Sequence, residues 1–517
     1  MKSIKIKLTL FASLLVLFTA CDKDFEEVNT NPNNPETVSS SLLLPTIIRN
    51  SVYEVQGLAW GYGNVVMQYS AKIQFTNEDR YNWGPQGGPY NDFYNALRDV
   101  KNIIEFSDEL DQPNYKGVAL VMKSWMYSFM TDAYGELPYT EATSAKEGEN
   151  LPAFDTQEVI YQGVISDLEL ANQLLGTGTE SVEGDILFDG DMMRWKKFAN
   201  SLLLRIHMRL SDRIDPSSAM QAILSNPAQF PIMESNDDNI ALQFLSDIPN
   251  QQPLYTTRSG SFDEYRLSTN MESILKGIND PRLYAYAQPT TDSEAGIIGA
   301  VEVDDYAGVP NGLADEEALG YSPSGDPEQG GSNFISRIGL MYSCSACTDL
   351  ASPIAAQAMI MSYSELQFIL AEARERGFIT TGDAATYYQN GIEASFDYYE
   401  SRLSVGGYDE LLAVIQPDAA YFAQADVAYT GSQAELLEKI GRQKWISLFF
   451  NGMEAWFDWR RTGFPTITPG PAAVQPTVPV RFIYPTAVQA LNADNYRAAI
   501  SRQGPDNLTT RLWWDVN

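Results

Sequence analysis

The stretch VALVMKSWMYSFMTDA at residues 118–133 decides the fold class. Its apolar side chains recur at intervals of three and four residues, at Val118, Val121, Met122, Trp125, Met126, Phe129, Met130 and Ala133. Because an α-helix has about 3.6 residues per turn, this spacing puts these side chains on one face. The stretch therefore predicts an amphipathic helix.

The same periodicity recurs in other parts of the chain. The segments that show it are residues 155–175, 195–210, 366–373 and 432–448. Two of them open with a pair typical of a capping box, Asp155 with Glu158 and Ser432 with Glu435. These signals predict a chain made mainly of helices.

The predicted helices pair across short turns. The pairs fall at residues 90–134, 155–212 and 363–401. Successive helix pairs are typical of tetratricopeptide-like solenoids, so we expect an all-α, tetratricopeptide-like helix-pair scaffold. Between about 214 and 360 the periodicity fades and Pro, Gly, Asn, Asp and Ser are dense, which predicts a long loop-rich region that faces the ligand. No later stretch has the composition of a linker, and we expect one domain at residues 41–517.

The N-terminus carries an export signal. Three lysines precede an apolar run at residues 8–18, which is too short to span a membrane and fits a signal peptide at residues 1–20. The sequence Leu-Phe-Thr-Ala-Cys that ends at Cys21 resembles the lipobox of bacterial lipoproteins, which implies that Cys21 is lipidated. The alternative is an ordinary secretory signal with a chance cysteine. Residues 21–40 are acidic and then rich in Asn and Pro, and we expect a flexible tether there.

Composition excludes several kinds of chemistry. The 517 residues carry a formal net charge of −32, which disfavours nucleic acid as a partner. There is one histidine, His207, and there are three cysteines, so His-rich and four-cysteine zinc sites are impossible. We expect no metal and no cofactor. His207 lies at the edge of an apolar stripe, and we interpret it as a partly buried structural residue.

Two motifs admit more than one interpretation. Cys344 and Cys347 form a CxxC pair, which we expect to be a local disulfide because exported proteins keep disulfides; two free thiols are the alternative. Glu454 and Asp458 lie one helical turn apart and could act as a catalytic pair. The alternative, which we favour, is that they form salt bridges with Arg460 and Arg461 while the neighbouring tryptophans pack. We expect no catalytic residues.

Two stretches combine aromatic rings with polar side chains outside any helical stripe. Sugar C–H groups stack on aromatic rings, and hydroxyl groups need polar partners. The first stretch is a turn-rich loop, in which we expect Tyr81 and Trp83 to form an aromatic platform. The candidate ligand-binding residues are Asn77, Arg80, Tyr81, Trp83 and Tyr90 in the first stretch and Tyr255, Arg258, Phe262 and Tyr265 in the second. Packing under a loop is the alternative for each of these rings.

Six short stretches, in this order, resemble a known family. They are DAYGELPY at 132–139, WKKFANSL at 195–202, NDPRL at 279–283, YAGVPNG at 306–312, SEL with AEA at 364–373, and EAWFDWRRTGFP at 454–465. Together with the lipobox they resemble the SusD/RagB family of nutrient-binding outer-membrane lipoproteins, in its second SusD-like branch. The resemblance implies a non-enzymatic protein on the cell surface, anchored in the outer membrane. It also implies capture of oligosaccharides, or of peptides, for a TonB-dependent SusC-like transporter barrel.

Two other functions remain as alternatives at this stage. One is a secreted all-helical glycoside hydrolase with two catalytic carboxylates. The other is a surface scaffold that binds only proteins. The sequence does not name the ligand.

Overall fold

A computed structural model of the chain describes residues 39–290, 302–322 and 334–516. The signal peptide, Cys21 and all but the last residues of the predicted tether lie outside the described residues. The first described helix, α3 (Ser40–Leu58), begins where the tether was predicted to end. No helix in the described ranges is long and apolar enough to cross a membrane.

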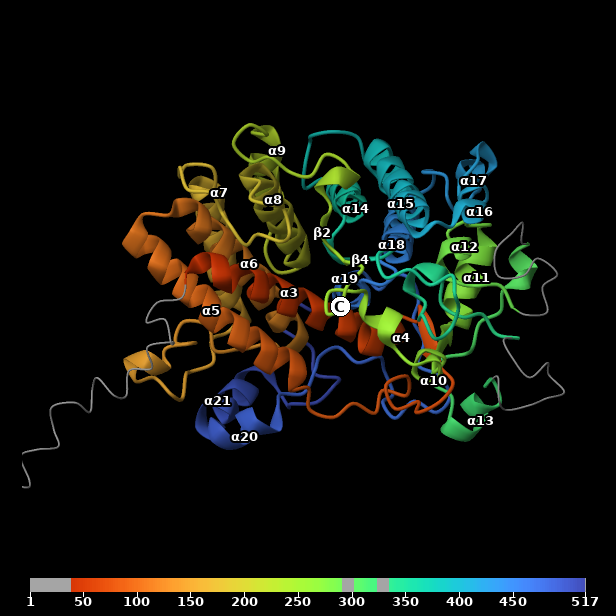
Figure 1. The fold of residues 1–517 in the computed structure, drawn as a ribbon, viewed down its shortest axis with the longest axis horizontal. Coiled ribbons are helices and arrows are strands. Elements are labelled where there is room, and N and C mark those ends of the chain that lie inside the picture. The colour runs from red at the N-terminus through yellow and green to blue at the C-terminus, as the bar shows by residue number, and fades with distance from the viewer. Residues whose placement is uncertain (1–38, 291–301, 323–333, 517) are drawn as a thin grey trace, which may run out of the picture.

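The N-terminal half of the chain forms one group of packed helices, on the left of Figure 1. Besides α3 these are α5 (Gly88–Leu110), α6 (Pro113–Tyr134), α7 (Gln157–Leu174) and α8 (Met192–Arg209). The predicted helix at 118–133 is confirmed as part of α6, which is buried on almost every side because α5 and α7 pack against it. Gly117 permits α6 to approach the end of α7 closely, since a Cβ atom there would lie 2.7 Å from Leu175 Cγ.

The start of α7 differs from the prediction in one detail. Its N-cap is Thr156, whose side chain accepts a hydrogen bond from the Val159 amide at 3.4 Å. The Asp155 carboxylate accepts hydrogen bonds from the main-chain amides of Tyr139 and Thr140 instead, at 3.0 and 2.8 Å. Asp155 therefore ties the turn after α6 to the start of α7 rather than capping the helix.

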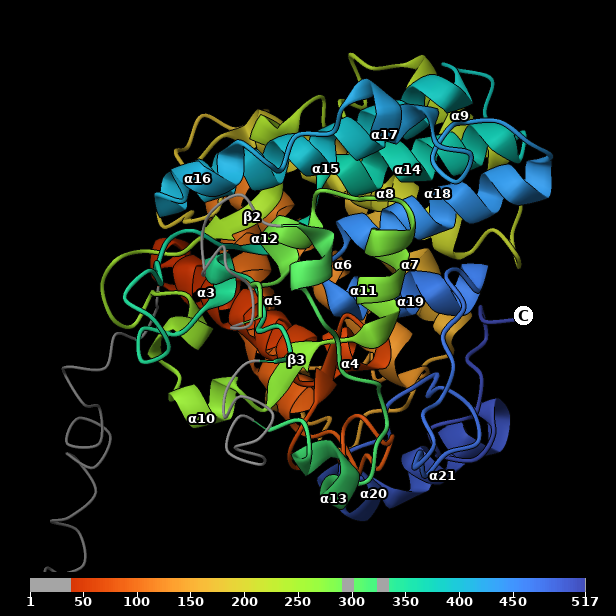
Figure 2. The ribbon, with the colours of Figure 1, turned by 90° about the vertical axis from the view of Figure 1, so that its right-hand side faces the viewer.

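The C-terminal half of the chain forms a second group of helices. It consists of α14 (Tyr363–Glu375), α15 (Ala384–Gly406), α16 (Asp409–Leu412), α17 (Ala419–Ala423), α18 (Gln433–Ser447) and α19 (Gly452–Thr462). Of these, α14 to α18 lie in the upper part of Figure 2 and α19 lies below them. The predicted capping box is present, because Ser432 and Glu435 exchange hydrogen bonds at the start of α18. α14 packs against both α15 and α18 and also contacts α8, which joins the two groups. The all-α helix-pair scaffold is confirmed.

The loop-rich region between 214 and 360 holds short elements. Its helices are α9 (Ser217–Ser225), α10 (Ser259–Phe262), α11 (Thr269–Gly277), α12 (Leu283–Tyr286) and α13 (Asp315–Leu319). Two antiparallel pairs of strands order it: β1 (Ser70–Lys72) with β3 (Tyr265–Leu267) connects the region to the N-terminal half, and β2 (Ile240–Gln243) with β4 (Gln357–Met361) joins its two ends. The region is thus less irregular than its composition indicates.

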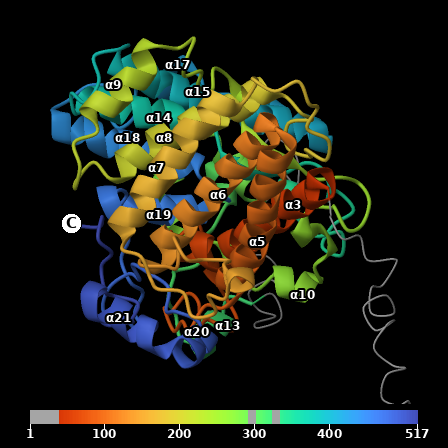
Figure 3. The same cartoon turned by 90° about the vertical axis from the view of Figure 1, so that its left-hand side faces the viewer.

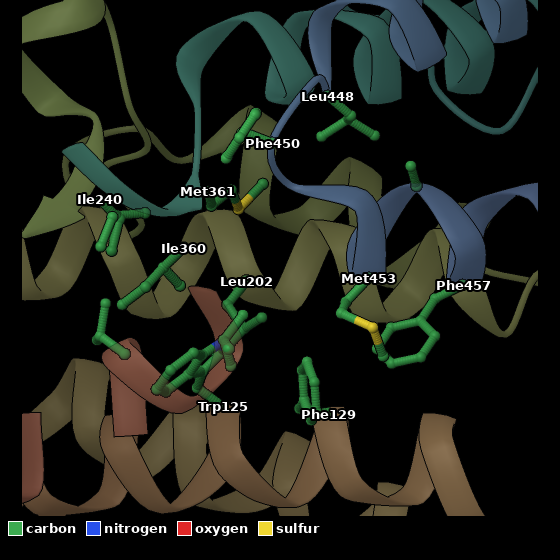
Figure 4. Packing of buried hydrophobic residues seen from close by; sticks show 14 of the residues in the cluster. Trp125, Phe129, Leu202, Ile240, Ile360, Met361, Leu448, Phe450, Met453 and Phe457 are labelled. Atoms are coloured by element: carbon green, nitrogen blue, oxygen red, sulfur yellow. The ribbon is translucent and has the colours of Figure 1, made fainter. Parts of the chain in front are cut away.

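The core lies where the helix groups meet. Figure 4 shows Trp125 and Phe129 of α6 facing Leu202 of α8 and Phe457 of α19. The rings of Phe129 and Phe457 pack edge to face with centroids 5.2 Å apart. Two last helices, α20 (Thr486–Leu491) and α21 (Ala493–Gln503), lie below α19 on the side of the C-terminus (Figure 3).

Candidate ligand-binding surface

The pairing of β1 with β3 brings the two predicted ligand-binding stretches together. Lys72 is the register partner of Tyr265, and the amide of Ile73 donates to the Glu264 carbonyl at 2.9 Å. The loop that follows β1 and the segment that precedes β3 therefore share one part of the surface. Figure 2 shows β3, α4 (Asn64–Val66) and α10 close together there.

The nine predicted ligand-binding residues differ in exposure. Asn77 and Arg258 are exposed, Arg80 and Tyr255 are half-buried, and Tyr81, Trp83, Tyr90, Phe262 and Tyr265 are buried. The buried rings present no face to a ligand in this structure.

Tyr81 and Trp83 do not form the expected platform. Their exposed fractions are 1% and 6%. The Trp83 indole donates to the Glu78 carbonyl at 2.8 Å and packs edge-on against Trp456 and Phe482. The loop thus folds down over α19, and packing under a loop, the alternative interpretation, describes both residues.

Trp60 and Tyr62 occupy the exposed side of the same region, and sequence analysis missed them. Both belong to η1 (Ala59–Gly63), a π-helical turn between α3 and α4. Turns of this kind are frequent at functional sites. The ring of Trp60 lies 4.3 Å from that of Tyr265, and both Trp60 and Tyr62 are only half-buried. The signal that could have found them is the alternation of aromatic residues and glycines in the sequence AWGYG.

η1 is fixed against the core by a contact between two backbones. A Cβ atom at Gly63 would lie 2.5 Å from the carbonyl carbon of Gly452, at the start of α19. Only glycine permits this approach. The contact holds the turn that carries Trp60 against the start of the buried helix α19.

Phe75 is the most exposed aromatic side chain of this region, at 66%. Its φ of 51° lies in the left-handed region, which is unfavourable for a bulky residue. The next residue holds the backbone there, because the Thr76 amide and hydroxyl both donate to Asp315 Oδ1 at 2.8 Å. Strained residues of this kind cluster at ligand-binding sites. We call Trp60, Tyr62, Phe75, Asn77 and Arg258 the aromatic surface.

Charged groups lie beside the aromatic surface. The Lys72 ammonium lies 2.7 Å from Glu78 Oε2 and 3.8 Å from Glu264 Oε2. Burial raises the pKa of Glu264, and Lys72 opposes the shift. Glu78 and Glu264 are half-buried and offer hydrogen-bond acceptors next to apolar rings, a combination that suits sugars, whereas Lys72 is buried between them.

Glu454 and Asp458 are engaged in a buried ion network. Glu454 pairs with Arg209, and Asp458 Oδ1 lies 3.0 Å from both Lys444 Nζ and Arg461 Nη2. Burial opposes the ionisation of Asp458, but these cations hold its pKa below the usual value. This matches the favoured salt-bridge interpretation, with one difference: Arg460 donates to the main-chain carbonyls of Asp132 and Val480.

The remaining motifs fall outside the aromatic surface or beside it. Cys344 and Cys347 are joined in a disulfide, and the Ser345 amide between them donates to the Tyr255 carbonyl at 2.9 Å. His207 is partly buried in the last turn of α8. Over the described ranges, no group of three or more His, Cys, Asp and Glu side chains is placed to hold a metal ion.

Comparison with known proteins agrees with this architecture. A family model for SusD-like proteins, described as starch-binding and associating with the outer membrane, matches residues 32–485. A SusD homologue from Bacteroides fragilis aligns with a TM-score of 0.78 and 25% identity, over 93% of this chain and 99% of that one. An outer-membrane protein of Bacteroides vulgatus connected with nutrient binding aligns at 0.74 and 27%, over 93% and 100%.

A chitin-binding protein aligns with a TM-score of 0.75 and 28% identity, over 93% of this chain and 100% of that one. No protein of curated function matches the chain. The family match covers most of the sequence, and the solved structures share the fold along almost its whole length. The chain therefore belongs to the SusD/RagB family of outer-membrane-associated, nutrient-binding proteins.

Proposed function

We propose that this protein is a lipid-anchored protein of the cell surface that captures oligosaccharides on the aromatic surface and delivers them to a TonB-dependent transporter barrel. The observation that carries the proposal is Phe75, a bulky ring that is 66% exposed on a backbone held at positive φ. An exposed ring on a strained backbone that its neighbours hold in place fits a binding role.

The chemistry of the surface suits sugars. The rings of Phe75, Trp60 and Tyr62 offer apolar faces for sugar C–H groups, and Asn77 and Arg258 can bond to hydroxyl groups. The family description names starch, and one structural relative is a chitin-binding protein. Both observations favour a glycan over a peptide as ligand.

The protein binds its ligand without cleaving it. Glycoside hydrolases need one carboxylic acid that is protonated and a second carboxylate beside the scissile bond. Glu454 and Asp458 are instead buried and paired with buried cations, which leaves neither carboxylate open to a substrate. We propose capture, and not hydrolysis, as the activity.

Incubation with two glycans tests the proposal. Chitohexaose and maltoheptaose are added to the purified mature protein, binding is measured by calorimetry, and products are followed by mass spectrometry. We expect at least one glycan to bind and to remain intact. Shorter products that disappear in Glu454→Gln would instead support a hydrolase, and binding of casein peptides but of neither glycan would support peptide capture.

The anchor and the barrel need a separate test. The tagged wild-type chain is extracted in mild detergent, with Cys21→Ala as the variant. We expect the wild type to fractionate with membranes and to bring down a large outer-membrane barrel in near-equal amount, and the variant to be soluble. A wild-type chain that is recovered alone in several detergents would contradict the delivery step.

A further inference from the structure

A pocket lies where α19 ends, on the side of the C-terminus. Its volume is about 780 Å³, within the range of sites that bind small molecules. Figure 3 shows the C-terminus and α10 on opposite sides of the molecule, so this pocket is separate from the aromatic surface. None of its lining residues belongs to that surface.

The pocket has a fixed aromatic wall. α19 ends at Thr462 and is capped by Gly463, whose φ is 73°, and residues 463–480 then form no helix or strand. The half-buried Trp459 lines the pocket, and its indole donates to the Pro465 carbonyl at 3.0 Å. The hydrogen bond fixes the orientation of the ring, and Ile467 and Val478 extend the apolar wall.

Cations dominate the lining. Of the described residues that line the pocket, four are arginines and one, Asp212, is acidic. Arg461 is paired with Glu372 and Asp458, and Arg376 lies 2.8 Å from Glu372. Glu372 and Asp458 are not among the lining residues, whereas Asp212, which lies 3.6 Å from Arg376, is.

Arg460 is buried at the pocket with incomplete bonding. Its exposed fraction is 3%, and its terminal nitrogens donate only to the carbonyls of Val480 and Asp132. Its Nε has no hydrogen-bond partner within the described chain. Burial lowers the pKa of Arg460 to about 10, which the nearby Asp132 and Asp515 do not offset. An anion in the pocket would supply the missing compensation.

We propose that this pocket binds a sugar that carries a carboxylate, such as a uronic acid unit of an oligosaccharide. Arginine guanidinium groups bind carboxylates through charge-assisted hydrogen bonds, and Trp459 offers a ring for the sugar face. The choice of a sugar over other carboxylates rests on the proposed function. The overall negative charge does not forbid an anion, since salt screens charges beyond about 8 Å at physiological ionic strength.

The test compares an acidic and a neutral trisaccharide on matched variants. Calorimetry measures trigalacturonic acid and maltotriose on the mature protein, on Arg511→Gln and on Arg497→Gln. Arg511 lines the pocket with 51% of its side chain exposed, and Arg497, at 66%, pairs with an aspartate on α21 away from it. Arg511 also pairs with the buried Asp515, so the fold of both variants is checked by circular dichroism before binding is measured.

We expect trigalacturonic acid to bind about tenfold or more weakly to Arg511→Gln, and equally well to Arg497→Gln and to the wild type. Its binding should weaken in about 0.5 M NaCl. Equal affinity for both trisaccharides at this pocket, or equal effects of the two variants, would overturn the inference. If triglycine competed for the pocket as strongly as the acidic sugar does, the assignment of a sugar as the ligand would be overturned.

Phe75→Ala separates this inference from the proposed function. We expect it to leave the binding of trigalacturonic acid unchanged, because Phe75 does not line the pocket. If Phe75→Ala abolishes that binding and Arg511→Gln does not, the acidic sugar binds at the aromatic surface. That result would overturn the second site while supporting the first.

Discussion

Lys72 and Tyr265 face one another across the β1–β3 pair, with the Lys72 ammonium 4.9 Å from the centre of the Tyr265 ring. This pair joins two segments that are far apart in sequence and that each carry predicted ligand-binding residues. It also places a cation over a ring that contacts Trp60, at 4.3 Å between centroids. The arrangement fixes the ring on which Trp60 rests and so orients the aromatic surface.

The disulfide between Cys344 and Cys347 should be present in the exported protein. Mass spectrometry of the unreduced chain should show it lighter by two hydrogen atoms. Because the ring is short, the double variant Cys344→Ser with Cys347→Ser should lose less than the usual ~2–4 kcal/mol of unfolding free energy. Two thiols that alkylate in the folded, unreduced protein would contradict the pairing.

Glu54 should make stability depend on pH. It lines a cavity of about 370 Å³ between α3 and α5 together with Asp92 and Asp99. Burial, and then the nearby Asp92, raises the pKa of Glu54 to about 7. From about pH 4.5 to 7 the folded protein therefore keeps a proton that the unfolded chain has lost, and the free energy of unfolding falls as the pH rises.

The variant Glu54→Gln tests this dependence. Denaturant unfolding should show Glu54→Gln more stable than the wild type at pH 8 and close to it at pH 4.5. Glu109→Gln, an exposed change on the same helix pair, should show no such difference. A variant whose stability follows the wild type at both pH values would mean that Glu54 ionises normally.

His207 should make the free energy of unfolding depend on pH in the direction opposite to that of Glu54. Burial lowers the pKa of His207 to about 4. Between about pH 6.5 and 4 the unfolded chain binds a proton that the folded protein does not, so the free energy of unfolding falls as the pH drops, by on the order of 2 kcal/mol. His207 is the only histidine, so its imidazole signals in an NMR titration report the pKa directly. A midpoint near 6.5 would refute the shift.

The helices were predictable because their signals are local. The stripe at 118–133 and the capping box of Ser432 with Glu435 lie within single elements, and both are confirmed. Asp155 was misassigned because its partners, the amides of Tyr139 and Thr140, lie across a turn from it. A capping signal in the sequence indicates that a helix begins nearby, but it does not show which of two adjacent polar residues will be the N-cap.

The candidate site was predictable in position but not in its exposed residues. Turn residues around Tyr81 and Trp83 indicate a loop, yet the side on which a loop presents its rings depends on distant partners. For Trp83 these are Trp456 and Phe482, close to the other end of the chain. Trp60 was missed because the alternation of aromatic residues and glycines in AWGYG does not by itself indicate a π-helical turn or which side of it faces the solvent.

The most direct test of the account is calorimetric binding of chitohexaose and maltoheptaose to Phe75→Ala and Trp60→Ala. Leu110→Ala serves as the control, because Leu110 is 65% exposed at the end of α5 and outside the aromatic surface. For whichever glycan binds the wild type, each aromatic variant should lose about 1–3 kcal/mol of binding free energy, by analogy with the stacking of bases on aromatic side chains, and Leu110→Ala should lose none. Wild-type affinity in both folded aromatic variants would contradict capture at the aromatic surface.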